Sequence, residues 1–178
     1  MISPLEAIEL LKNITIPFRT EKLPLAKTLG MNIAEKIVAD RDFPPFDRVM
    51  MDGLAVRSSG CRRFLVQGVA AAGMPQIILP PAEDAAIEVM TGAVLPDGAD
   101  VVLPCEWYDL HDGVAVLQTG KAAKAGEFIH RKGSDHLAGD ALLRSGVRLG
   151  PVEIGIAAAC GCAEIQVAAP LRIAGLGT

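Results

Sequence analysis

Three short segments of this sequence combine glycine with a carboxylate or a hydroxyl group. They contain Asp52-Gly53, Thr91-Gly92 and Gly133-Ser134-Asp135. Loops of this kind can present polar side chains and backbone N–H groups to one ligand. A carboxylate can hold Mg²⁺ or orient water, and a threonine hydroxyl beside a glycine N–H can bind phosphate or another oxyanion. Taken alone, however, each segment is more often a simple turn.

Several other catalytic signatures are missing from the sequence. It has no Ser/His/Asp elbow, Walker loop, G-x-G-x-x-G fingerprint or H-E-x-x-H helix, so the corresponding hydrolase, phosphoryl-transfer, dinucleotide and zinc-protease chemistries lack support. The four cysteines have neither a disulfide framework nor zinc-site spacing. This cysteine usage favours reduced thiols in a cytoplasmic protein.

The composition is that of a globular protein. Of 178 residues, 51% are hydrophobic, and 17 Lys and Arg stand against 21 Asp and Glu, for a net charge of −4. Because no cluster of basic residues is present, nucleic-acid binding is not expected. No apolar run approaches the roughly 20 residues that a membrane helix needs, and acidic Glu6 and Glu9 replace the basic start of a signal peptide.

Helical signals lie at the two ends of the sequence. Ser3-Pro4-Leu5-Glu6 is a capping box followed by an apolar stripe, which predicts a helix with one buried face. Leu149-Gly150-Pro151-Val152-Glu153 predicts the start of a second, mostly apolar helix that ends at Gly161. Strands are expected at 163–167 and 171–176.

The middle of the sequence is instead rich in strand signals. Short apolar runs are separated by turns that contain proline and glycine, and they predict strands at 54–57, 64–68, 77–79, 86–90, 99–103 and 114–118. We therefore predict an α+β protein: a small β-barrel or sandwich-like domain at 46–136, inserted into a helix-containing outer domain made of 1–45 plus 137–178. The prolines at 44 and 45 mark a connector between the two domains.

The order of these segments closely resembles the molybdopterin molybdenumtransferase family, MoeA and the gephyrin E domain, along essentially the whole chain. The matching motifs are Phe43-Pro44-Pro45-Phe46-Asp47, Met51-Asp52-Gly53, Met90-Thr91-Gly92-Ala93 with Leu95-Pro96, and Gly133-x-Asp135-x-x-x-Gly139-Asp140. Gly177-Thr178 stands where the family's T-G-x-E motif begins, at the entry to an α/β pterin-binding domain. The resemblance therefore covers the family's first two domains only.

The resemblance implies an enzyme of molybdenum cofactor biosynthesis. In that family, molybdate is inserted into adenylylated molybdopterin with release of AMP and with help from Mg²⁺, in a cleft at a homodimer interface; other proteins of the same pathway are possible partners. By motif, the catalytic residues would be Asp52, Thr91 and Asp135, the substrate-binding residues Gly53, Gly92, His130 and Arg131, and the Mg²⁺ ligands Asp52 and Asp135. The fragment alone is expected to be inactive. A non-catalytic dimerising scaffold or binding module of the same fold is the alternative.

The sequence departs from the family at several of these motifs. Arg48-Val49-Met50 replaces the usual Asn-Ser-Ala, and Ser134 replaces a glutamate. His130 stands where an arginine is expected, which weakens anion binding because an ordinary histidine is mostly uncharged at neutral pH. Adjacent Arg131 is the sequence-based candidate to replace that charge.

Overall fold

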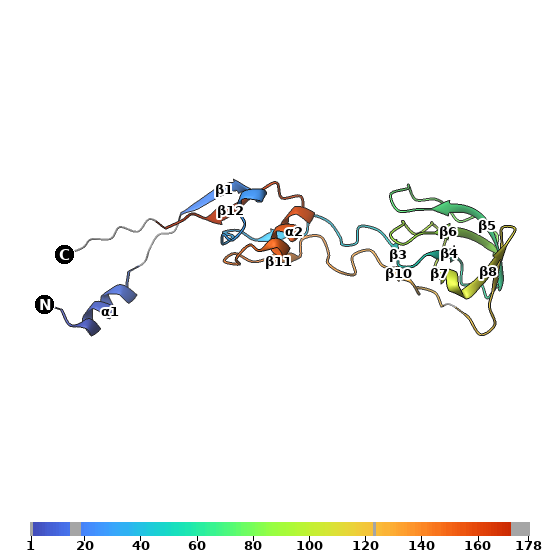
Figure 1. Ribbon diagram of the computed structural model, residues 1–178, viewed down its shortest axis with the longest axis horizontal. Helices are drawn as coiled ribbons and strands as arrows, with labels where there is room; N and C mark the ends of the chain where they lie inside the picture. The colour runs from blue at the N-terminus through green and yellow to red at the C-terminus, as the bar shows by residue number, and fades with distance from the viewer. Residues whose placement is uncertain (1, 15–18, 123, 172–178) are drawn as a thin grey trace. The chain divides into compact units, whose positions relative to one another are not determined.

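The computed structural model describes residues 2–14, 19–122 and 124–171. The chain folds into two compact units, an outer unit of residues 1–38 with 141–178 and an inserted unit of residues 39–140 (Figure 1). The predicted insertion, 46–136, lies inside these limits. The two connecting segments lie within the inserted unit and pair with each other: Ala39 N–H donates to the Asp140 carbonyl (2.9 Å), and Phe43 N–H donates to the His136 carbonyl (2.8 Å).

In the described residues of the outer unit there are two α-helices and two small antiparallel strand pairs. Its elements are α1 (Pro4–Lys12), β1 (Thr20–Pro24), the 3₁₀ turn η1 (Leu25–Lys27), β2 (Ile37–Val38), β11 (Ala141–Leu143), α2 (Pro151–Ala159) and β12 (Glu164–Ala168). β1 pairs with β12, and β2 with β11. The core gathers around Ile33, Leu149 and Ile165, with Ala157 of α2 packed into it. Neither helix in the described part of the chain has the length and apolar character that a membrane span needs.

The predicted capping box of α1 is confirmed, but its predicted buried face is not. Ser3 N–H donates to Glu6 Oε2 (2.7 Å), and Glu6 N–H donates to Ser3 Oγ (3.2 Å). No residue of α1 is buried, and Leu5 and Leu11 are 75% and 66% exposed. The cap depends only on neighbours along the chain, whereas burial needs a partner surface. The predicted strand at 171–176 falls almost wholly outside the described residues.

Helix α2 begins as predicted, at Pro151, where Gly150 N–H donates to Glu153 Oε2 (2.9 Å). Gly155 lies exposed inside this helix, and apart from its two chain neighbours and the backbone of its own helix nothing lies within 4 Å of the position that a Cβ would take. We expect Gly155→Ala to stabilise the chain by about 0.5–1 kcal/mol, because alanine restricts the unfolded backbone more than glycine does. Urea denaturation measures the gain. Gly150→Ala is the control and should give none, since alanine is a poor N-cap residue.

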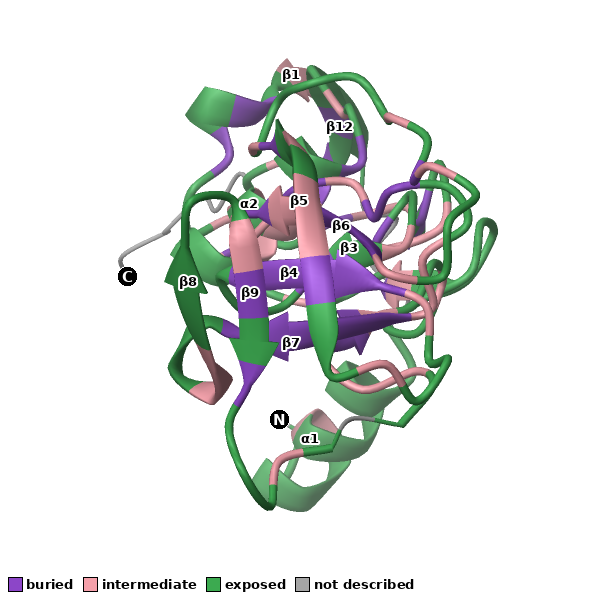
Figure 2. Cartoon of the chain, turned by 90° about the vertical axis from the view of Figure 1, so that its right-hand side faces the viewer, coloured by how far each residue is buried: buried purple, intermediate pink, exposed green. Residues whose placement is uncertain are grey.

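The inserted unit is built on one six-stranded sheet. Its strands are β4 (Gly53–Val56), β5 (Arg63–Ala70), β6 (Ala85–Val89), β7 (Val101–Pro104), β8 (Tyr108–His111) and β9 (Val114–Leu117), in the order β7-β4-β6-β5-β9-β8. β5 and β6 are parallel, and the other pairs are antiparallel. The sheet has two edges, β7 and β8, so the predicted small β-rich domain is an open half-barrel (Figure 2). Two-residue strands β3 (Arg48–Val49) and β10 (Ile129–His130) form a separate pair, and η2 (Cys105–Trp107) is a 3₁₀ turn.

Both faces of this sheet are covered. Ala55, Val89 and Val102 belong to one apolar cluster, while Leu54 and Leu103 belong to another. Central strands buried on both faces read as continuous apolar runs, which explains why β4, β6 and β7 were predictable. Figure 2 shows β4 and β7 almost entirely buried.

The predicted strand at 77–79 is wrong. Only an isolated bridge joins Ile78 to Asp97 there. The guanidinium of Arg57 donates to the carbonyls of Leu79 (3.0 Å) and Pro80 (2.7 Å), so these acceptors are occupied by a side chain and not by a strand. Leu79 is nevertheless buried, which accounts for the apolar pattern.

Candidate functional site

Asp52 and Thr91, predicted from separate motifs, are in direct contact. Asp52 Oδ1 accepts hydrogen bonds from both Thr91 N–H and Thr91 Oγ1, each 2.7 Å long. The strand register explains the contact: Gly53 at the start of β4 pairs with Val89 at the end of β6, so the residues just outside these strands meet. Both side chains are exposed. We call this contact the Asp52–Thr91 pair.

The two glycines of these motifs shape the backbone around the pair. A Cβ at Gly53 would lie 1.9 Å from the carbonyl oxygen of Leu103 on β7, so only glycine permits this close strand approach. Gly92 has a φ of +87° and donates its N–H to the carbonyl of Val49 (2.9 Å). Because the Gly92 N–H is already used within the protein, this glycine positions the Thr91 turn.

Several ionisable side chains lie beside the pair, and two of them, Cys105 and Tyr108, were not singled out as site candidates from the sequence. Cys105 N–H donates to the Asp52 carbonyl (3.0 Å). Burial, then the hydrogen bond and charge of Glu106 and the charge of Asp52, raise the pKa of the Cys105 thiol. Burial, then the nearby Cys105, Glu88 and Glu106, raise the pKa of Tyr108 to about 12. Cys105 lies beside Asp52 because Gly53 pairs with Pro104 in the β4–β7 register. Knowledge of that pairing, and not a motif, would have been needed to identify Cys105.

The Asp52 carboxylate is held in its charged form. The hydrogen bond from Thr91 N–H, followed by that from Thr91 Oγ1, lowers the pKa of Asp52 below its ordinary value of 3.8. We expect Thr91→Val to raise the pKa of Asp52, because the hydroxyl donor is lost. The stabilising interaction is present at neutral pH and is lost as the pH falls through the lowered pKa. NMR titration of the Asp52 carboxyl carbon measures the shift, and an unchanged pKa in Thr91→Val would contradict the assignment.

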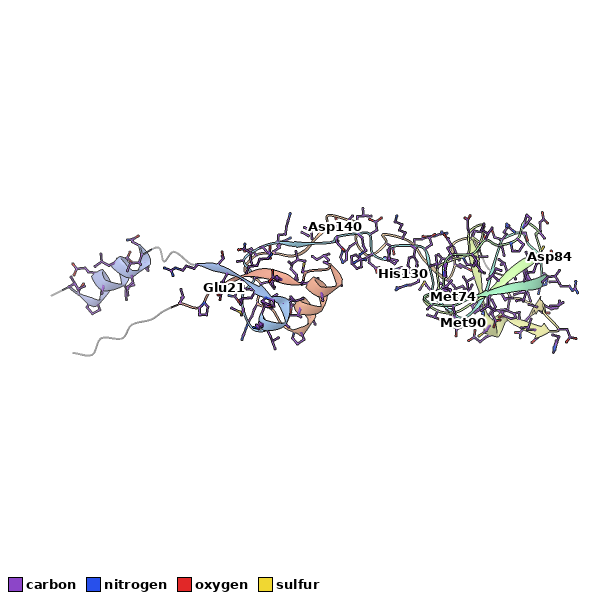
Figure 3. All side chains as sticks on the ribbon, turned by 90° about the horizontal axis from the view of Figure 1, so that it is seen from above. Glu21, Met74, Asp84, Met90, His130 and Asp140 are labelled. Carbon is purple, nitrogen blue, oxygen red and sulfur yellow. The ribbon has the colours of Figure 1, made fainter. Side chains whose placement is uncertain are left out.

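Asp135 belongs to a second cluster of the inserted unit. Its Oδ1 lies 2.8 Å from His130 Nε2, and His130 Nδ1 lies 3.0 Å from Arg48 Nη2. The β3–β10 register places Arg48 directly opposite His130, and Figure 3 labels His130 on β10. We call this arrangement the Arg48–His130–Asp135 chain.

Arg131, the sequence-based replacement for the expected arginine, is paired with a carboxylate. Its Nη1 lies 2.5 Å from Asp47 Oδ2, and Lys132 N–H donates to Asp47 Oδ1 (2.8 Å). Partial burial raises the pKa of Asp47, but the hydrogen bonds from Lys132 and Arg131 and the charge of Arg131 outweigh burial and leave this pKa below its ordinary value. The positive charge of Arg131 is therefore already offset within the protein.

The described residues do not assemble a metal centre. No hydrogen bond joins Asp135 to Asp52 or Thr91 among them, and none of them form a group of three or more His, Cys, Asp or Glu that could hold a metal ion. Asp52 nevertheless offers one exposed carboxylate. This suits Mg²⁺, which keeps several waters and commonly takes only one or two protein carboxylates together with substrate phosphates.

The sequence and the fold both match one family. The model of the MoeA N-terminal region (domain I and II) matches residues 2–161, so the chain belongs to the MoeA family. It is 37% identical over 177 residues to a molybdopterin molybdenumtransferase of Synechocystis sp., covering 97% of this chain and 45% of that protein. The corresponding enzyme of Haemophilus influenzae is 32% identical over 173 residues, covering 96% of this chain and 42% of the relative.

Solved structures agree with this assignment. The molybdopterin biosynthesis MoeA protein from Pyrococcus horikoshii superposes with a TM-score of 0.79 and 32% identity, over 94% of this chain and 44% of that one. The resemblance seen in the motifs is thus confirmed. The chain spans less than half the length of these relatives.

Proposed function

We propose that this chain is the N-terminal part of a cytoplasmic enzyme that inserts molybdenum from molybdate into adenylylated molybdopterin and releases AMP. The observation that carries the proposal is the contact of Asp52 with Thr91 at 2.7 Å, in a chain of the MoeA family. Two exposed polar residues 39 positions apart meet at the ends of the neighbouring central strands β4 and β6. An ordinary turn does not require such a long-range pairing.

Each residue of the pair has a distinct task in the proposed reaction. Thr91 donates two hydrogen bonds to Asp52 Oδ1. These bonds keep the carboxylate charged and fix its orientation. Asp52 Oδ2 would hold Mg²⁺ as a single protein ligand or orient a water molecule. A bound Mg²⁺ would neutralise phosphate charge on the adenylylated substrate. Gly53 and Gly92 hold the backbone that brings the two side chains together.

The remainder of the site is proposed to come from outside this chain. Because Asp52 and Thr91 are exposed and the relatives are about twice as long, we place them opposite the pterin-binding region of a second subunit in a homodimer. Other proteins of molybdenum cofactor biosynthesis are the proposed partners that supply the substrate. The 178 residues alone should therefore show no molybdenum insertion.

A chimera tests the proposal. In it, this chain replaces the matching N-terminal part of the Synechocystis relative, to which it is 37% identical. We expect the chimera to insert molybdenum from molybdate into adenylylated molybdopterin and to release AMP, whereas the remaining part of the relative alone should not. A chimera that is folded and dimeric but inactive would refute the proposal and favour the non-catalytic scaffold.

A further inference from the structure

Arg48, which is linked to Asp135 through His130, has no carboxylate partner among the described residues. Arg131 is paired with Asp47 (2.5 Å), and Lys132 Nζ lies 3.5 Å from Asp42 Oδ2. Within the described part of the chain, the guanidinium of Arg48 forms no ion pair, and its hydrogen-bond partner is the His130 ring (3.0 Å). The charge of Arg48 is therefore not offset as the neighbouring charges are.

The hydrogen-bond directions fix the state of His130. A guanidinium can only donate, so His130 Nδ1 must accept the bond from Arg48 Nη2 and carries no proton. The ring proton then sits on Nε2 and is donated to Asp135 Oδ1 (2.8 Å). Asp135 is itself anchored, because its backbone N–H donates to the Phe43 carbonyl (2.9 Å). The Arg48–His130–Asp135 chain thus orients one exposed guanidinium.

We propose that Arg48 is the anion-binding residue of the inserted unit and that His130 is its positioning residue. The ligand is a tetrahedral oxyanion group of the substrates, either a phosphate of the adenylylated pterin or molybdate. A guanidinium has five N–H donors in a planar fork, and the His130 bond uses only one Nη2 proton. The remaining donors can bind two oxygens of one oxyanion side by side. This inference rests on the proposed function for the identity of the anion.

The cross-strand register supplies a further argument. Arg48 on β3 and His130 on β10 are directly paired, so a cation at either position extends over the same patch of surface. Arg48 therefore supplies a positive charge to this patch even though residue 130 is a histidine. Arg131, the next residue along the chain, cannot supply this positive charge because its guanidinium forms an ion pair with Asp47.

Binding is measured on the isotopically labelled 178-residue chain by NMR titration, with inorganic pyrophosphate in one series and molybdate in the other. We expect saturable shifts of the Arg48 Nε–H and His130 ring signals in at least one series, and the responding series identifies which oxyanion is bound. Arg48→Gln should weaken binding by about tenfold or more, since the charged donor is lost. Arg63→Gln, which removes an exposed arginine on β5 of the same unit, is the matched control and should change the affinity less than threefold.

An exchange variant separates charge placement from general disruption. The double replacement Arg48→His with His130→Arg keeps the net charge but should also weaken binding by about tenfold, because Asp135, whose Oδ1 lies 2.8 Å from the ring at position 130, would pair with the relocated guanidinium as Asp47 pairs with Arg131. Amide spectra show which variants are folded. No saturable shift with either anion, or unchanged affinity in a folded Arg48→Gln variant, would overturn the inference. These binding experiments do not depend on the activity of the chimera. A failure of the anion-binding proposal can therefore be distinguished from a failure of the proposed function.

Discussion

Replacing Gly53 by alanine should destabilise the inserted unit by at least about 3 kcal/mol, the upper range for overpacking. The new Cβ would meet the Leu103 carbonyl oxygen at 1.9 Å and its carbon at 2.8 Å, and both atoms are backbone that cannot rotate away. β4 and β7 would have to separate where four pairs of residues now face each other. Chemical denaturation of the chain, followed by the fluorescence of its one tryptophan, Trp107, measures the loss.

The matched control is Gly113→Ala in the turn between β8 and β9. Gly113 has a φ of +76°, but open space surrounds its Cβ position. Alanine should therefore cost only about 1 kcal/mol, the usual strain of a left-handed conformation. Equal losses in the two variants would show that β4 and β7 do not approach as closely as described.

Replacing Asp52 by asparagine in the chimera should lower the rate of molybdenum insertion by about 10²-fold, a typical effect of removing one preorganised electrostatic group. The asparagine Oδ1 can still accept both hydrogen bonds from Thr91, so the turn is retained and only the charge is lost. The midpoint of thermal unfolding should therefore hardly change. Insertion and unfolding are measured on the same preparation.

Asp84→Asn provides the matched control for this variant. Asp84 lies just before β6, at the opposite end of that strand from Met90 and the Thr91 turn (Figure 3). The control should insert molybdenum at the unaltered rate. Normal activity in Asp52→Asn, or a large fall of its unfolding midpoint, would indicate that Asp52 is only a turn residue.

The elements that could be predicted from the sequence are those with local causes. The cap at Ser3 and the helix start at Pro151 depend on neighbours along the chain, and both are present. The two-residue strands β3 and β10 could not be predicted, because so short a strand has no periodicity of its own. Their pairing comes from contacts across about 80 positions.

The candidate site was predictable only in part, for the same reason. The motifs identified Asp52 and Thr91, but their contact follows from the β4–β6 register, which is non-local. The same sheet brings Cys105 beside Asp52, and no motif indicated that. Asp135 was grouped with the pair by sequence, whereas its hydrogen bond is to His130.

A double-mutant cycle on the Asp52–Thr91 pair tests the account most directly. Molybdenum insertion is measured in the chimera for the unaltered sequence, Asp52→Asn, Thr91→Val and the double variant. If the pair acts as one unit, the double variant should be about as slow as the slower single variant, because the second change removes a partner that already lacks its function. Independent losses that multiply in the double variant would contradict the claim that Asp52 and Thr91 act as one unit in the reaction.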